Sequence, residues 1–154
     1  MRSAYRVIAY VIAAEVAIQA AMVAYAIFGL GVWVDKNGGV LDKASMESDL
    51  DFPGVVGFAV HGMNGMMLIP LIALVFFIVS FFAKIPGGVK WAGFVLLAVI
   101  VQVTLGLFGH ENAIFGIFHG LNALLLFSLA VMAGKRAATV SPEQTPSAAV
   151  PDAV

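Results

Sequence analysis

Residues 52–83 read FPGVVGFAVHGMNGMMLIPLIALVFFIVSFFA and carry no charged side chain over 32 positions. Two more charge-free runs follow, 20 residues from Trp91 to His110 and 23 residues from Asn112 to Gly134. A helix needs about 20 apolar residues to cross the hydrocarbon core of a bilayer, so each run is long enough to span it. The sequence therefore predicts an integral membrane protein.

A fourth apolar stretch, from Val7 to Leu30, opens the chain and is interrupted only by Glu15. Ala24 and Ala26 are the small residues that a signal peptidase prefers, but the run is longer than the apolar core of a signal peptide, so we expect a retained signal anchor. The predicted fold class is all-α, an integral membrane four-helix bundle. It covers residues 1–136, with helices at about 4–30, 54–83, 89–109 and 112–134.

The composition limits the classes of partner and cofactor. The 154 residues are 62% hydrophobic and 11% charged, whereas soluble domains are about half apolar and a quarter charged. A net charge of −1 with eight Lys and Arg residues gives no basic patch, so we exclude nucleic acid and expect the lipid bilayer as partner. The absence of cysteine excludes disulfides, c-type haem attachment and cysteine-ligated iron–sulfur or zinc sites.

The basic residues are divided unevenly between the two ends of the predicted spans. Two of them, Lys36 and Lys43, fall on one side, and six fall on the other, namely Arg2, Arg6, Lys84, Lys90, Lys135 and Arg136. Cytoplasmic loops of membrane proteins carry the excess of Lys and Arg. We therefore expect a multi-pass protein of the plasma membrane, with both termini in the cytoplasm and the loop 31–53 outside.

The segments outside the spans give weaker signals. In the outer loop, Asn37-Gly38-Gly39 stands between apolar residues and predicts a small hairpin. The five carboxylates of this loop lack the spacing of a calcium site, so we expect a solvated acidic surface. The segment 137–154 is rich in Pro, Ala, Ser and Thr, a composition that predicts a disordered cytoplasmic tail.

A short internal repeat contains two of the three histidines of the chain. Residues 61–64 read His-Gly-Met-Asn, and residues 119–122 read His-Gly-Leu-Asn. Each histidine lies seven residues into its predicted helix, which places both about 10 Å below the outer surface. The two helices run in the same direction and can occupy diagonal corners of a bundle, so the two imidazoles can face each other at one level.

Two facing imidazoles at matched depth are the axial ligands that one haem iron takes, so His61 and His119 are the predicted iron ligands of one haem b per chain. The glycines one turn away leave room for a flat ring, and the asparagines one turn further inside can bond across helices; these cofactor-binding candidates are Gly57, Gly65, Gly116, Gly120, Asn64 and Asn122. Two other interpretations remain open at this point, ordinary helix packing by small and polar residues and a different metal.

The segment Gln102-Val-Thr-Leu-Gly106, followed by Phe118-His119-Gly-Leu-Asn-Ala-Leu-Leu-Leu-Phe127, resembles the haem A synthase family. That family is built from two similar four-helix halves, with a Gln-x-x-Leu-Gly stretch on one helix, a histidine near the start of the next, and a partner histidine about sixty residues upstream. The separation between His61 and His119 is 58 residues. The resemblance covers about half of the chain and adds Gln102 to the candidate cofactor-binding residues.

The chain also departs from that family pattern. Phe58 stands one turn before His61 and Gly62 follows it, where the family has a glutamate and an arginine, and only one four-helix half is present. The resemblance therefore implies haem ligation and not the oxygenation of a haem methyl group.

We expect an electron-transfer protein or a haem-bearing subunit of a respiratory membrane complex. The alternatives are a cofactor-free accessory subunit and a haem-modifying enzyme like haem A synthase. Other membrane subunits or further copies of this chain are the partners that these functions suggest.

Two more polar groups need an interpretation. Glu15 lies near mid-membrane, where a carboxyl group must be protonated, paired or in contact with water. We expect it to bond to Gln19, four residues on, or to Gln102, with a proton relay as the alternative.

His110 and Glu111 lie at the outer edge. A metal site formed by all three histidines and Glu111 has suitable ligand types, but His110 is placed too high for it, so we expect an exposed loop histidine.

Overall fold

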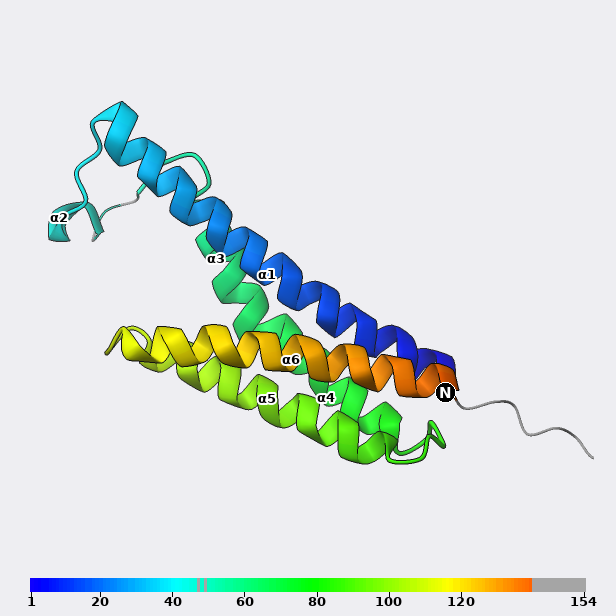
Figure 1. The fold of residues 1–154 in the computed structure, drawn as a ribbon. Coiled ribbons are helices and arrows are strands. Elements are labelled where there is room, and N and C mark those ends of the chain that lie inside the picture. The colour runs from blue at the N-terminus through cyan, green and yellow to red at the C-terminus, as the bar shows by residue number, and fades with distance from the viewer. Residues whose placement is uncertain (47, 49, 140–154) are drawn as a thin grey trace, which may run out of the picture.

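The computed structural model describes residues 1–46, 48 and 50–139, and all its regular structure is helical (Figure 1). The first span is α1 (Arg2–Asn37), and the second consists of α3 (Val56–Met63), the π-helix η1 (Asn64–Leu68) and α4 (Ile69–Ser80). The third and fourth spans are α5 (Gly88–Phe108) and α6 (Ile114–Thr139). All four are long and apolar enough to cross a membrane, so the predicted all-α, four-span bundle is confirmed.

The first and last helices are longer than the sequence predicted. The expected end at residue 30 is wrong, because α1 continues to Asn37 and ends where Gly38 takes the left-handed conformation, with φ 70° and ψ 23°. A glycine in that conformation closes a helix without steric cost, so the Asn-Gly pair ends a helix instead of turning the expected hairpin. The fourth helix includes residues 137–139 of the predicted tail; the rest of that tail, 140–154, lies outside the described residues.

The second span contains an irregularity that the sequence analysis did not predict. Between α3 and α4 the backbone bonds shift to the π pattern, in which the N–H of Ile69 reaches the carbonyl of Asn64. Pro70 follows at once, and a proline removes a donor and pushes away the carbonyl four residues before it. The extra residue in this turn sets the direction of Asn64 and Gly65, one turn beyond His61.

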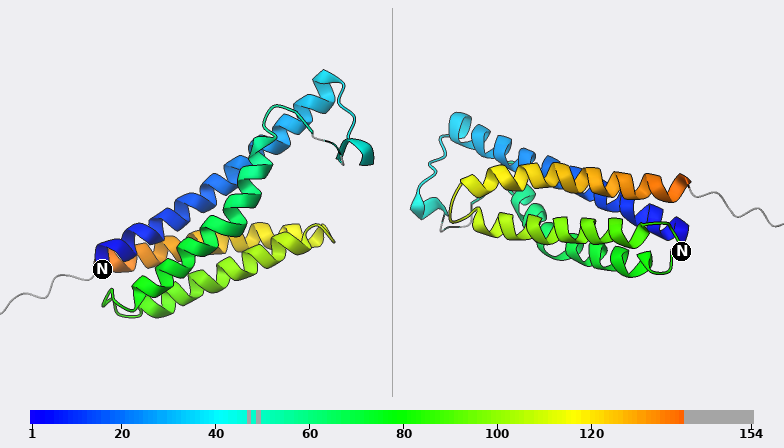
Figure 2. Two further views of the ribbon diagram at one scale, coloured as in Figure 1. Left: turned by 180° about the vertical axis from the view of Figure 1, so that it is seen from behind. Right: turned by 60° about the horizontal axis from the view of Figure 1, so that its bottom comes forward.

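The helices follow one another around the bundle. α1 packs against α6 and against both halves of the second span, whereas α5 packs against α6 and α4. The second and fourth spans therefore occupy opposite corners, and the third and fourth are antiparallel neighbours, as predicted. The N-terminus and the end of α6 lie at the same end of the bundle (Figures 1 and 2).

Packing is tightest at the end where α1 begins. Tyr5 and Phe76 are fully buried there with ring centroids 4.5 Å apart, and the Tyr5 hydroxyl donates to the carbonyl of Gly88 at 3.0 Å. Small residues let the helices approach around these rings, namely Ala9, Ala13, Ala73, Ala92, Ala130 and Ala133. From this end α1 leans away from α5 and α6, so the bundle widens toward the other end (Figure 1 and the left view of Figure 2).

The loop after α1 contains one further helical turn, α2 (Lys43–Met46). Asp42 caps it, because the backbone N–H of Ser45 donates to the Asp42 carboxylate at 2.8 Å and the Ser45 hydroxyl oxygen accepts from the Asp42 N–H at 2.9 Å. The Ser45 N–H also holds the pKa of Asp42 below its ordinary value.

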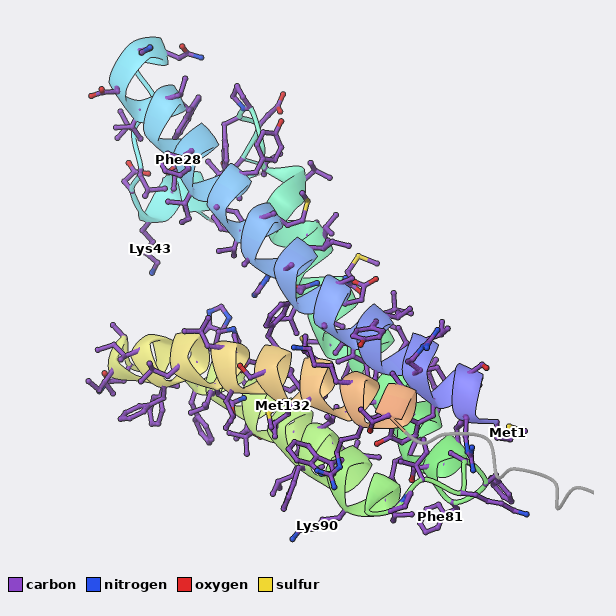
Figure 3. The ribbon with its side chains drawn as sticks, turned by 45° about the vertical axis from the view of Figure 1, so that its right-hand side comes forward. Met1, Phe28, Lys43, Phe81, Lys90 and Met132 are labelled. Carbon is purple, nitrogen blue, oxygen red and sulfur yellow. The ribbon has the colours of Figure 1, made fainter. Side chains whose placement is uncertain are left out.

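Large apolar side chains are exposed on all four spans, and Figure 3 draws them as sticks. Phe28, Phe81 and Met132, which Figure 3 labels, are 77%, 58% and 48% exposed. Exposed apolar side chains on helices of spanning length are suited to contact with lipid chains.

The buried aromatic pair provides a test of the packed end. Phe76→Ala should lower the free energy of unfolding by about 3 kcal/mol, because it removes a fully enclosed ring. Phe28→Ala is the matched control, since lipid replaces a side chain that already faces outward. Thermal denaturation in lipid nanodiscs measures both, and equal losses from the two variants would contradict this description of the core.

Candidate functional site

A cavity of about 590 Å³ lies where the bundle widens. Its walls come from all four spans and are mostly aliphatic, with polar side chains at five positions, Gln19, His61, Gln102, His110 and His119. This volume is within the range of about 300–1,000 Å³ that small-molecule and cofactor sites occupy. A largely apolar cavity with a few polar groups is the form expected of a cofactor site within a membrane.

His61 and His119 face each other beside this cavity. Their ring centroids are 6.0 Å apart and their planes differ by 65°. They come from the diagonal pair of spans, α3 and α6, which run in the same direction. The predicted meeting of the two repeat histidines at one level is confirmed.

The orientation of His119 is set by the backbone of α5. Its Nδ1 lies 3.1 Å from the carbonyl oxygen of Gln102, and because a carbonyl only accepts, Nδ1 must carry the proton. Nε2 is then the nitrogen with a free lone pair. A carbonyl that holds one ring nitrogen while the other is free is the arrangement found around metal-binding histidines.

Gly106 provides the space that the His119 ring occupies. A Cβ atom at this position would lie 3.2 Å from Cε1 and 3.3 Å from Nδ1 of His119. Gly106 is one turn beyond Gln102 on α5, so the helix offers a carbonyl and a gap side by side. Gly106 is the last residue of the Gln-x-x-Leu-Gly stretch and was not among the predicted site residues.

Asn122 ties α6 to α5 one turn below His119. Its Nδ2 donates to the side-chain oxygen of Gln102 at 2.7 Å and to the carbonyl of Ala98 at 2.9 Å. Gln102 thus supports the site twice, through its backbone to His119 and through its side chain to Asn122. The predicted bonding of Asn122 across helices is confirmed.

Asn64 makes the corresponding contact on the other side of the bundle. Its Nδ2 donates to a carboxylate oxygen of Glu15 at 2.7 Å. The expected partners of Glu15, Gln19 and Gln102, are therefore wrong. The Gln102 side chain already accepts a hydrogen bond from Asn122 of α6. The Gln19 side chain faces Gly65, where an added Cβ atom would lie 3.5 Å from the Gln19 oxygen.

Several buried polar atoms in this region have no hydrogen-bond partner among the described residues. They are Nδ1 of His61, Oδ1 of Asn64, and both amide atoms of Gln19, whose side chain is only 8% exposed. A buried polar group left unpaired costs about 1–3 kcal/mol. Gln19 was predicted only as a partner of Glu15; the feature that marks it in the sequence is a second polar residue in an otherwise apolar span.

The four predicted glycines occupy different places. Gly65 and Gly120 line the cavity, and a Cβ atom at Gly120 would meet nothing within 4 Å. Gly116 is exposed and lies outside the cavity wall. Gly57 is buried against α1, where a Cβ would clash with the carbonyl of Met22. Two of the four therefore leave room at the cavity, while Gly57 serves helix packing.

His110 lies at the outer rim of the cavity and is exposed. In the described part of the chain, no group of three or more His, Asp or Glu gathers in a way that could hold a metal ion. The three histidines and Glu111 do not converge into one such group.

The geometry of the histidine pair fits a single iron. Metal–imidazole bonds are about 2.0 Å long and the ring centre lies about 1.2 Å beyond the nitrogen, so two imidazoles on opposite sides of one ion have centroids about 6.4 Å apart. The observed separation of 6.0 Å is close to this value. Together with the cavity and the free Nε2 of His119, this spacing makes the residues present suitable for a bis-imidazole haem.

Comparison with known proteins adds no relative. No protein-family model, no curated protein and no solved structure matches the chain.

The contact at Gly106 gives a test of the His119 environment. Gly106→Ala should displace the His119 ring and weaken its bond to the Gln102 carbonyl, seen as an upfield shift of the Nδ1–H proton in ¹⁵N-histidine-labelled protein. Gly93→Ala is the matched control on the same helix, because its Cβ would meet only Phe77 at an ordinary 3.6 Å. An unchanged His119 resonance in Gly106→Ala would refute this role for Gly106.

Proposed function

We propose that this protein binds one b-type haem per chain and transfers electrons in the membrane, by itself or as the haem-bearing subunit of a respiratory complex. His61 and His119 are the axial ligands. The remaining cofactor-binding residues are those that line the ring or hold the ligands in place, Gly65, Gly106, Gly120, Gln102 and Asn122.

The proposal rests on the histidine pair itself, which comes from two diagonal helices and has its ring centroids 6.0 Å apart. Ionisable side chains are costly within a membrane and are functional where they occur. Packing alone gives no reason for two imidazoles at one level beside a cavity of about 590 Å³. The resemblance of residues 102–127 to the haem A synthase family supports the same pair.

The function follows from the ligand set. An iron held by two imidazoles has no open coordination position, so the group supplies one-electron transfer and does not readily bind oxygen. The mostly apolar walls give the site a low dielectric environment, and the Gln102 carbonyl increases the electron donation of His119 by accepting a hydrogen bond from its Nδ1–H. The chain thus contributes to the redox chemistry by orienting the histidine ligands and by surrounding the site with apolar side chains.

Substitution of each histidine tests the assignment. His61→Ala and His119→Ala should each abolish the low-spin haem spectrum, because each removes one axial ligand, whereas His110→Ala should keep it. Absorbance spectra of the oxidised and dithionite-reduced proteins, purified with native lipids, provide the measurement. A wild-type protein without a Soret band, or retention of the low-spin spectrum in both single variants, would rule out the haem assignment.

The proposal includes an orientation in the plasma membrane. Six of the eight Lys and Arg residues lie at the end of the bundle that holds the N-terminus, which places that end in the cytoplasm. The histidine pair then lies toward the outer leaflet, on the side where a redox partner outside the cell can approach.

Cysteine labelling tests this orientation without background, because the chain has no cysteine of its own. A membrane-impermeant maleimide should label Ser48→Cys in intact cells, and Ser3→Cys only after permeabilisation. The opposite pattern would place the histidines near the inner leaflet.

A further inference from the structure

The unpaired buried atoms between α1 and the second span form a matched set. Gln19 Nε2 is a donor, and Gln19 Oε1 and Asn64 Oδ1 are acceptors. His61 Nδ1 is a donor in one tautomer of the ring and an acceptor in the other. Buried polar atoms without partners on two packed helices indicate side chains that can pair after rotation.

The printed contacts place Gln19 at the level of His61. One turn before His61, Gly57 packs against Met22 of α1, and one turn after it, Gly65 faces the Gln19 side chain. Asn64 reaches Glu15, one turn before Gln19 on α1. Because the two helices run in opposite directions, the contacts above and below bring His61 and Gln19 to the same height, and both line the cavity.

Only one pairing satisfies all four atoms. Gln19 Nε2 donates to Asn64 Oδ1, and His61 Nδ1–H donates to Gln19 Oε1. If His61 carried its proton on Nε2 instead, the two hydrogens of Gln19 Nε2 could serve His61 Nδ1 and Asn64 Oδ1, but Gln19 Oε1 would have no donor among these atoms. The pairing therefore selects the tautomer whose Nε2 is free, as the Gln102 carbonyl does for His119.

We propose that Gln19 is the positioning residue of His61, and that it connects this imidazole through Asn64 to the carboxylate of Glu15. The complete relay runs from Nδ1–H of His61 to the oxygen of Gln19, from the amide of Gln19 to Asn64, and from Asn64 to Glu15. The last bond is present at 2.7 Å. Gln19 thus gives His61 the support that the backbone of α5 gives His119.

The relay also affects the reduction potential of an iron bound at His61, an effect that rests on the proposed function. A hydrogen bond accepted from Nδ1–H makes the imidazole a stronger electron donor. A stronger donor favours the ferric state and lowers the reduction potential. The two ligands then differ in kind, since His119 is held by a fixed backbone carbonyl and His61 by a side chain linked to a carboxylate.

The bond from His61 to Gln19 is tested by NMR of the full-length, ¹⁵N-histidine-labelled protein in lipid, with any haem iron kept in its diamagnetic reduced state. Gln19→Met keeps the length of the side chain and removes the amide, so the His61 Nδ1–H proton should move upfield. Gln19→Glu keeps an acceptor, so that proton should stay at its position or move further downfield. Thr104→Val is the control, because its hydroxyl bonds only to its own helix at Ile100.

The proposal is wrong if the His61 Nδ1–H resonance is the same in Gln19→Met and in the wild type, or if His61 Nδ1 carries no proton in the wild type. If Gln19→Met does not fold, the Gln19→Glu result decides: loss of the His61 Nδ1–H bond in that variant would also refute the relay.

Reduction potentials separate this inference from the proposed function. With haem bound, the potential should rise in Gln19→Met and fall in Gln19→Glu, and Thr104→Val should leave it unchanged. A haem-containing protein whose potential is the same in all variants would refute the relay and keep the haem. A haem-free wild type whose His61 resonance still depends on Gln19 would refute the haem and keep the relay.

Discussion

Polar side chains inside a bilayer have no water to bond to, so each must find its partner within the bundle. In this protein, pairs of polar side chains join neighbouring helices. Asn122 and Gln102 join α6 to α5, and Asn64 and Glu15 join the second span to α1. The two sets lie on opposite sides of the cavity, and each stands beside one of the facing histidines.

The bundle combines a packed end with an open one. Around Tyr5 and Phe76, alanines bring the backbones close and leave no space between the rings. Toward the other end α1 leans away from α6, and the gap is a cavity of about 590 Å³. At the open end the two imidazoles are 6.0 Å apart between ring centroids, and the orientation of His119 is set locally by the Gln102 carbonyl.

The sequence was sufficient to predict the features that depend on composition and on the spacing of the repeated histidine motif. Charge-free runs identified the spans, and the parallel direction of the two repeats predicted that His61 and His119 meet across the diagonal. The features missed depend on tertiary contacts. Nothing in the sequence shows that Gly57 packs on Met22, that Asn64 and not Gln19 bonds Glu15, or that the turn before Pro70 takes the π form. The same Asn-Gly signal suits a hairpin and a helix end, and here Gly38 ends α1 in the left-handed conformation.

The proposal that the chain binds one haem is the central claim, and the amount of haem per chain tests it most directly. Pyridine haemochrome analysis of protein purified in native-lipid nanodiscs, with the protein concentration from quantitative amino-acid analysis, measures that ratio. The account predicts one haem b per chain. A ratio near zero in protein that remains folded and monodisperse would contradict it.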